Sequence, residues 1–230
     1  MKKLVIFTGS GISAESGIKT FRESGGLWES YDIQEVATPQ AFQRNPELVL
    51  NFYNDRRKQV VQAKPNAAHL ALVELEQKYS VQIITQNIDD LHERAGSKNV
   101  LHLHGEIMKM RSSAHQDLIY EMKETEIKLG DKCEKGSQLR PHIVWFGEAV
   151  PKMEKAIELT MQADIFIVIG TSLEVYPAAS LLEYAPENIT KYLVDPNAKS
   201  LPHISNLTTV KKSAGDGVPL LVNKLNTNPS

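Results

Sequence analysis

The chain has a single cysteine, Cys133, among its 230 residues, so it cannot form an internal disulfide and suits a reducing compartment. It also lacks an excess of charge of either sign, because 26 lysines and arginines stand against 28 aspartates and glutamates. No apolar run approaches the ~20 residues needed to cross a bilayer, and the stretch after Met1-Lys2-Lys3 is too short for a signal peptide. These absences predict a cytoplasmic protein that binds a small molecule or a protein segment, not nucleic acid or a membrane.

Short apolar runs rich in valine and isoleucine recur along the chain, and polar residues or glycine follow each one: LVIF, VQIIT, VLHL, IFIVI and KYLV. Such runs are typical of strands buried on both faces, as in a parallel sheet covered by helices. Between them, residues 69–79 and 153–163 carry apolar side chains at helical spacing. The pattern predicts an α/β fold with a Rossmann-like, doubly wound parallel sheet, whose ligands bind at the carboxyl ends of the strands.

Two segments do not fit the sheet pattern. Residues 106–142 are charged with one short apolar patch, and residues 22–66 are poor in strand signals. The latter contain two predicted helices, the second starting near Asn45-Pro46 with proline in its first turn. We expect one domain over 1–230, with a large lobe at about 1–21, 67–105 and 143–230. Insertions at about 22–66 and 106–142 form the small lobe.

The stretch FTGSGISA, after the first apolar run, spaces Gly9, Gly11 and Ala14 as in the G-x-G-x-x-G/A pattern of dinucleotide-binding loops. In that pattern the second glycine lets a pyrophosphate approach the backbone. The alternative is a tight turn between a strand and a helix. A dehydrogenase would also carry an acidic residue about 20 positions on, at the end of a strand. Glu29 and Asp32 lie at that distance but not in a strand pattern, which disfavours a standard nicotinamide dehydrogenase.

Five further motifs follow the glycine loop: SGIKTFRESGGLW (16–28), TQNIDDLHERAG (85–96), HLHGE (102–106), VWFGE (144–148) and IGTSLEVYPA (169–178). In order and spacing they resemble the sirtuins, and most of all their bacterial CobB type, from residue 5 to about 215. The resemblance implies an NAD-dependent protein-lysine deacylase. In this reaction the acyl-lysine oxygen attacks the nicotinamide ribose and expels nicotinamide, and O-acyl-ADP-ribose and free lysine are released.

The resemblance also implies the roles of individual residues. His104 of the HG pair corresponds to the catalytic base, while His102 is expected to be structural. Asn87 and Asp89 are expected to hold the nicotinamide and its ribose, with Asn87 also catalytic. The alternative, from the residues alone, is that the asparagine and aspartates of this segment cap the next helix, Asp90 in particular. The complete set expected to bind NAD comprises Gly9, Ser10, Gly11, Ser13, Ala14, Glu15, Thr20, Phe21, Arg22, Trp28, Gln86, Asn87, Ile88, Asp89, Gly170, Thr171, Ser172, Leu193, Val194, Asp195 and Ala214.

A finer expectation concerns the acyl group. Tyr53 and Arg56 stand three apart on a predicted helix and match the Y-x-x-R pair of sirtuins that remove succinyl or malonyl groups. A guanidinium and a phenol can together bind a carboxylate. The alternative is a solvated helix face that carries Arg56, Arg57 and Lys58. The expected channel for acyl-lysine adds Val144, Phe146, Gly147, Glu148 and Val175.

Two departures from the family stand out. Leu193 occupies a strand end where related sirtuins usually carry asparagine. Many sirtuins also bind zinc through four cysteines in the small lobe, whereas this chain has only Cys133 there. We therefore expect no zinc and a lobe held by apolar contacts of Leu118, Ile119 and Met122. Alternative functions are NAD-dependent mono-ADP-ribosyl transfer and a non-catalytic, NAD-sensing adaptor.

Overall fold

The computed structural model describes residues 1–20, 31–171, 173 and 175–227. Its larger sheet has six strands in the order β3-β2-β1-β7-β8-β9, and all neighbours pair in parallel. The strands are β1 (Lys3–Thr8), β2 (Ser80–Thr85), β3 (Val100–His102), β7 (Ile165–Ile169), β8 (Thr190–Val194) and β9 (Leu207–Val210). The predicted α/β, doubly wound parallel sheet is confirmed.

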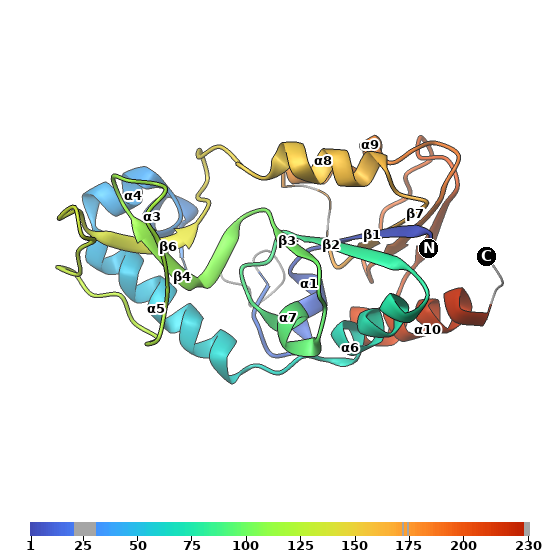
Figure 1. Cartoon of the computed structure of the whole chain (residues 1–230), viewed down its shortest axis with the longest axis horizontal. Helices are drawn as coiled ribbons and strands as arrows, with labels where there is room; N and C mark the ends of the chain where they lie inside the picture. Colours follow the sequence, from blue (N-terminus) through green and yellow to red (C-terminus); the bar gives the residue numbers. More distant parts are fainter. Residues whose placement is uncertain (21–30, 172, 174, 228–230) are drawn as a thin grey trace.

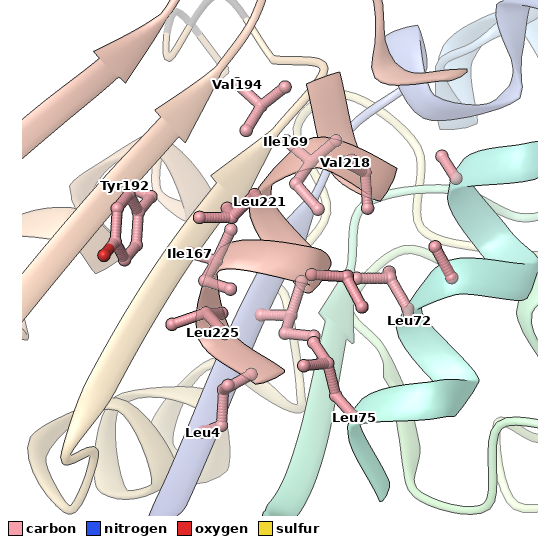
Figure 2. Packing of buried hydrophobic residues seen from close by; sticks show 14 of the residues in the cluster. Leu4, Leu72, Leu75, Ile167, Ile169, Tyr192, Val194, Val218, Leu221 and Leu225 are labelled. Atoms are coloured by element: carbon pink, nitrogen blue, oxygen red, sulfur yellow. The ribbon is translucent and has the colours of Figure 1, made fainter. Parts of the chain in front are cut away.

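Helices cover both faces of this sheet (Figure 1). On one face α6 (Ala67–Glu74) and α10 (Ala214–Thr227) pack over Leu4 and Ile167 in a buried cluster (Figure 2). On the other face α8 (Met153–Met161) and α9 (Leu181–Tyr184) pack over Phe7 and Phe166. Successive residues of a strand point to opposite faces of the sheet, and the residues of β1 after Lys3 are all buried. β1 is therefore covered on both sides, which is why its sequence is a continuous apolar run. The shorter helical elements are α1 (Gly11–Ala14), η1 (Leu75–Gln77), α7 (Leu91–Ala95) and η2 (Ala178–Ser180).

A second, antiparallel sheet lies apart from the first, in the order β5-β4-β6 (Figure 1). Its strands are β4 (Gly105–Ser112), β5 (Ile119–Glu121) and β6 (Leu139–Ile143), and the helices beside it are α3 (Ile33–Val36), α4 (Pro39–Arg44) and α5 (Pro46–Gln62). The expected start of α5 is confirmed, because Pro46 is its first residue and the Asn45 side chain accepts from the N–H of Leu48. The strands within 106–142 were not predicted, since charged residues break the alternation that marks a half-buried strand.

Apolar and polar contacts both hold this smaller part together. Leu118 and Met122 pack against a cluster around Leu50 as expected, but the expectation for Ile119 was wrong, because its side chain is exposed. The fully buried Arg57 of α5 donates to the carbonyls of Ile107 and Thr125. Asn54, one turn earlier, accepts from the N–H of Ile127 and donates to its carbonyl. Buried backbone groups of the insertion are thus satisfied by α5 side chains.

Strand β9 and helix α10 were also absent from the sequence prediction. β9 has only four residues, and its burial does not alternate. α10 begins among glycines and contains Pro219, both of which normally count against a helix interior. No helix in the described part of the chain is long and apolar enough to cross a membrane.

Because His69 and His92 are buried, we expect the folded protein to lose stability in acid. His69 and His92 stack edge to face with ring centres 5.0 Å apart, and burial lowers the pKa of His69 to about 4 and that of His92 well below its usual value. As the pH falls below about 6.5, the unfolded chain binds protons that the folded chain refuses, so stability decreases. His69 alone should remove about 3 kcal/mol between pH 6.5 and pH 4. Urea unfolding of the wild type and of His69→Gln measures this; an equally steep loss in both would contradict it.

Candidate active site

A cavity of about 590 Å³ lies at the carboxyl ends of β1, β2, β7 and β8. Gly9 follows β1, Gln86 follows β2, and Gly170 follows β7, and all three line the cavity. In the sheet, β1 has β2 on one side and β7 on the other, so the chain winds in opposite directions from this point. Ligands of doubly wound sheets bind at such a switch point, and the volume suits a cofactor-sized molecule.

The glycine loop packs directly against the end of β7. The N–H of Gly9 donates to the carbonyl of Ile169 at 3.0 Å, and the N–H of Gly11 donates to that of Gly170 at 2.9 Å. A Cβ on Gly9 would lie 2.7 Å from the carbonyl oxygen of Gly170, and one on Gly11 would lie 2.7 Å from its Cα. Gly170 itself has a φ of +61°. Close backbone packing therefore requires these glycines, in addition to any approach of a phosphate that the sequence pattern suggests.

Asn87 is fixed by hydrogen bonds inside the protein. Its side-chain N–H groups donate to the carbonyl of Gly9 and to Oγ of Ser13, both at 3.1 Å. Ser13 in turn donates to Oδ2 of Asp89 at 3.1 Å. Since both amide protons are used, the amide oxygen is the atom with which Asn87 can meet a ligand. Asn87 lines the cavity, and its oxygen can accept from an amide or stabilise a developing cation.

Asp89 also forms hydrogen bonds within the segment that follows β2. Its Oδ1 accepts from the N–H of Leu91 at 3.2 Å, and burial raises its pKa above the usual range. The alternative for this segment was a helix cap, at Asp90 in particular, and the structure supports its position but not a side-chain bond. Asp90 occupies the N-cap position of α7 without a side-chain cap bond, and its carboxylate pairs with Arg94. The preceding residue, Asp89, accepts instead from the N–H of Leu91, the first residue of α7.

His104 has the geometry of a general base. Its Nδ1 lies 3.0 Å from the carbonyl oxygen of Gln86. A carbonyl can only accept, so Nδ1 carries the proton and Nε2 keeps its lone pair. Burial lowers the pKa of His104, although the bond to Gln86 acts in the opposite direction. The ring is therefore neutral near pH 7, and it lines the cavity.

His102, two residues earlier, is bonded on both sides. Its Nδ1 lies 3.0 Å from the carbonyl oxygen of Asn87, and its Nε2 lies 2.8 Å from Oε1 of Glu93. Both partners only accept, so both ring nitrogens donate and the ring is an imidazolium. Burial acts to lower its pKa, but Glu93 raises it overall. His102 does not line the cavity, as expected of a structural residue.

Tyr53 and Arg56, which belong to α5, also line the cavity. They are 5% and 5% exposed, and Arg57 is fully buried, which rules out a solvated helix face for the two arginines. Of the three cationic residues, only Lys58 is exposed to solvent, and its ammonium pairs with Glu126. Nη2 of Arg56 donates to the carbonyl of Lys19 at 2.8 Å. Burial lowers the pKa of Arg56 to about 10, so the guanidinium remains charged at neutral pH.

The cavity brings together most of the residues singled out from the sequence. It is lined by both catalytic candidates, all seven substrate candidates and these NAD candidates: Gly9, Ser10, Gly11, Thr20, Gln86, Asn87, Ile88, Gly170, Thr171, Leu193 and Asp195. Six other candidates are not among the lining residues: Ser13, Ala14, Glu15, Asp89, Val194 and Ala214. Phe21, Arg22, Trp28 and Ser172 lie outside the described residues.

Two of these six residues, Glu15 and Ala214, belong to a contact that supports the site from behind the glycine loop. Glu15 accepts from Oγ of Ser213 at 3.0 Å and from the N–H of Gly215 at 2.5 Å. A carboxylate at the N-terminus of α10 is electrostatically favourable. Glu15 therefore joins the glycine loop to α10, the helix that begins at Ala214.

Sequence reasoning missed several lining residues. Trp145, Phe52, Tyr176 and Lys199 all line the cavity. Trp145 stands inside the VWFGE motif, whose other members were named. Trp145 is only 2% exposed, and a large buried aromatic residue cannot be told from the core by its sequence position alone.

Comparison with known proteins assigns this arrangement to a family. A model described as the Sir2 family matches residues 9–177. An NAD-dependent protein deacylase of Bacteroides thetaiotaomicron is 53% identical over 223 residues, which cover 95% of each chain. One of Helicobacter pylori is 54% identical over 225 residues, covering 98% of each. Among solved structures, a complex of a Sir2 homologue with NAD aligns with a TM-score of 0.88 and 42% identity, over 98% of this chain and 90% of that one. A Sir2 complex with a deacetylated p53 peptide and 3′-O-acetyl-ADP-ribose has a TM-score of 0.82 and 33% identity, over 96% and 92%.

Proposed function

The chain belongs to the Sir2 family and is an NAD-dependent protein deacylase, and we propose that it removes succinyl and malonyl groups from lysine as well as acetyl groups. The observation that carries the finer part is the pairing of Tyr53 and Arg56 at one end of the cavity. A buried guanidinium beside a phenol is suited to a carboxylate at the end of an acyl chain. A neutral acetyl group is shorter and needs neither.

We propose the remaining roles from the residues that line the cavity. NAD, when bound, supplies the ADP-ribosyl group that accepts the acyl group. His104 takes a proton at Nε2 from a ribose hydroxyl, and Asn87 offers its amide oxygen to the nicotinamide end. The glycine loop and Thr171 would hold the phosphates and the adenosine. The apolar wall formed by Val144 and Phe146 limits access of water to the reacting carbon.

The substrates we propose are acylated lysines of other proteins, in the cytoplasm. We assign NAD binding to a large lobe at about 1–21, 67–105 and 143–230, and acyl recognition to the contact of that lobe with a small lobe at about 22–66 and 106–142. The alternatives of ADP-ribosyl transfer and NAD sensing are not favoured, because the close relatives are named deacylases.

We also propose that the small lobe folds without zinc. Sγ of Cys133 lies 3.4 Å from Oγ of Ser112. Within the described ranges, no three His, Cys, Asp or Glu side chains gather as metal ligands. Dialysis against a strong chelator should leave the melting temperature and turnover unchanged, since no metal is lost. A drop in both, restored by Zn²⁺, would contradict this.

Mass spectrometry of the reaction products tests the proposed activity. The protein is incubated with an acyl-lysine peptide, with and without NAD. We expect the free lysine peptide and O-acyl-ADP-ribose only when NAD is present. An ADP-ribosylated peptide that keeps its acyl group would favour transfer, and NAD binding without any product would favour a sensor.

A further inference from the structure

A largely buried ion cluster adjoins the cavity at Glu148. Glu148 follows the loop 144–147 that lines the cavity, and its carboxylate accepts from Arg140 at 2.7 and 3.0 Å. It also accepts from Arg111 at 3.3 Å and from the N–H of Trp145 at 2.8 Å. Arg111 lies on β4 and Arg140 on β6, so Glu148 ties the loop to both strands. Burial acts to raise the pKa of Glu148, but these donors lower it below the usual value.

Arg140 makes a second contact that Arg111 does not share. Its guanidinium carbon lies 3.2 Å from the centre of the Trp145 ring, and Nη2 also donates to the carbonyl of Ile143 at 2.9 Å. On its other sides the ring of Trp145 meets those of Phe42 and Tyr53, with centres 5.3 and 6.3 Å apart. The guanidinium of Arg140 therefore stacks on the indole of Trp145 and forms an ion pair with Glu148 at the same time.

We propose that Arg140 is a positioning residue of the acyl pocket: it holds the indole of Trp145 against Tyr53 and thereby sets the wall that an acyl-lysine side chain must meet. The inference rests on the proposed function, because it takes this end of the cavity to be the acyl end. Arg140 itself is not among the lining residues of the cavity, whereas Trp145, Tyr53 and Glu148 are. It therefore acts through them.

The electrostatics of Tyr53 agree with this arrangement. Burial raises the pKa of Tyr53 above its usual value, while Trp145, Arg140 and Arg56 each act to lower it. Arg140 thus faces the phenol from β6 while Arg56 faces it from α5. Each of these cations also has a carboxylate near it, Glu148 at Arg140 and Asp89 near Arg56, so an anionic acyl group would be recognised by the donors of Arg56 and Tyr53 and not by an excess of positive charge.

The test separates stacking from charge. Arg140→Lys keeps the charge but loses the planar fork, so it cannot stack on Trp145 and bridge to Glu148 together. Trp145→Phe alters the same contact from the other side, and it serves if the arginine variant does not fold. Arg57→Lys is the matched control, since Arg57 is a buried arginine of the same part of the chain that does not line the cavity.

Kinetics are measured with an acetyl-lysine peptide, varying peptide and NAD separately. We expect Arg140→Lys and Trp145→Phe each to raise the KM for peptide about ten-fold or more. The KM for NAD should stay within about two-fold of wild type, and Arg57→Lys should change neither constant selectively. An unchanged peptide KM, or a parallel rise of both KM values, would overturn the inference. A wild type that removes no acyl group would instead refute the proposed function, and this result appears before any variant is made.

Discussion

Replacing His104 with alanine is expected to lower turnover by about 10²- to 10⁴-fold while NAD binds within a few-fold of wild type. The base is lost, but the cavity keeps its other donors and acceptors. Nδ1 of His104 donates only to the carbonyl of Gln86, so removal of the ring leaves the amide bonds of Asn87 intact. Turnover and NAD affinity are measured on the same preparation, by single-turnover kinetics and calorimetry.

The wild-type pH profile provides a second check on His104. The ring must be neutral to accept a proton, and burial lowers its pKa. Activity should therefore persist below pH 6.5 and fall only as the pH passes below the lowered pKa. His203→Ala, which removes an exposed histidine, should leave both rate and profile unchanged. Unchanged turnover in His104→Ala would refute its role as the base.

The second large effect is expected from Arg56→Met, which should lower kcat/KM for a succinyl-lysine peptide about 100-fold. Without Arg56, the carboxylate of a bound succinyl group would be buried without a charged partner, and its desolvation would not be compensated. Loss of acetyl-lysine turnover should be much smaller. It should not be zero, because Arg56 also acts on the buried carboxyl of Asp89 and opposes the rise of its pKa that burial causes. The comparison uses two peptides that differ only in the acyl group.

Two variants separate recognition from damage to the fold. Arg57→Met removes the adjacent buried arginine, which binds backbone carbonyls and not the cavity, so it should lower stability without changing the ratio of the two activities. Tyr53→Phe removes only the hydroxyl and should lower succinyl turnover more than acetyl turnover. Equal losses on both peptides in Arg56→Met would remove Arg56 from acyl recognition.

Much of the larger sheet could be predicted from sequence, because strands buried on both faces appear as plain apolar runs. The runs around Phe7, Ile84 and Phe166 are all central strands whose side chains fill the two cores. The polar residues that follow them had to meet at one edge of the sheet. This explains why Gly9, Gln86 and Gly170 could be placed in one cavity without a structure.

The small antiparallel sheet and the supporting contacts could not be predicted in this way. Its strands mix charged and apolar residues, and Arg57 and Arg111 read as surface positions although both are buried. Each of these arginines is buried because its partner comes from another part of the chain. Arg111 and Arg140 pair with Glu148, and Arg57 donates to the carbonyl of Thr125. A periodicity argument sees only neighbours three or four residues apart. The same limit hid the link between Arg140 and Trp145.

The most direct test of the account is a competition in one tube. Equal amounts of a succinyl-lysine and an acetyl-lysine peptide of identical sequence compete for limiting NAD, and mass spectrometry follows both products. The initial product ratio equals the ratio of the two kcat/KM values. The pocket formed by Tyr53 and Arg56 predicts that the desuccinylated peptide and O-succinyl-ADP-ribose dominate. Dominance of the deacetylated peptide, with the succinyl peptide untouched, would contradict it.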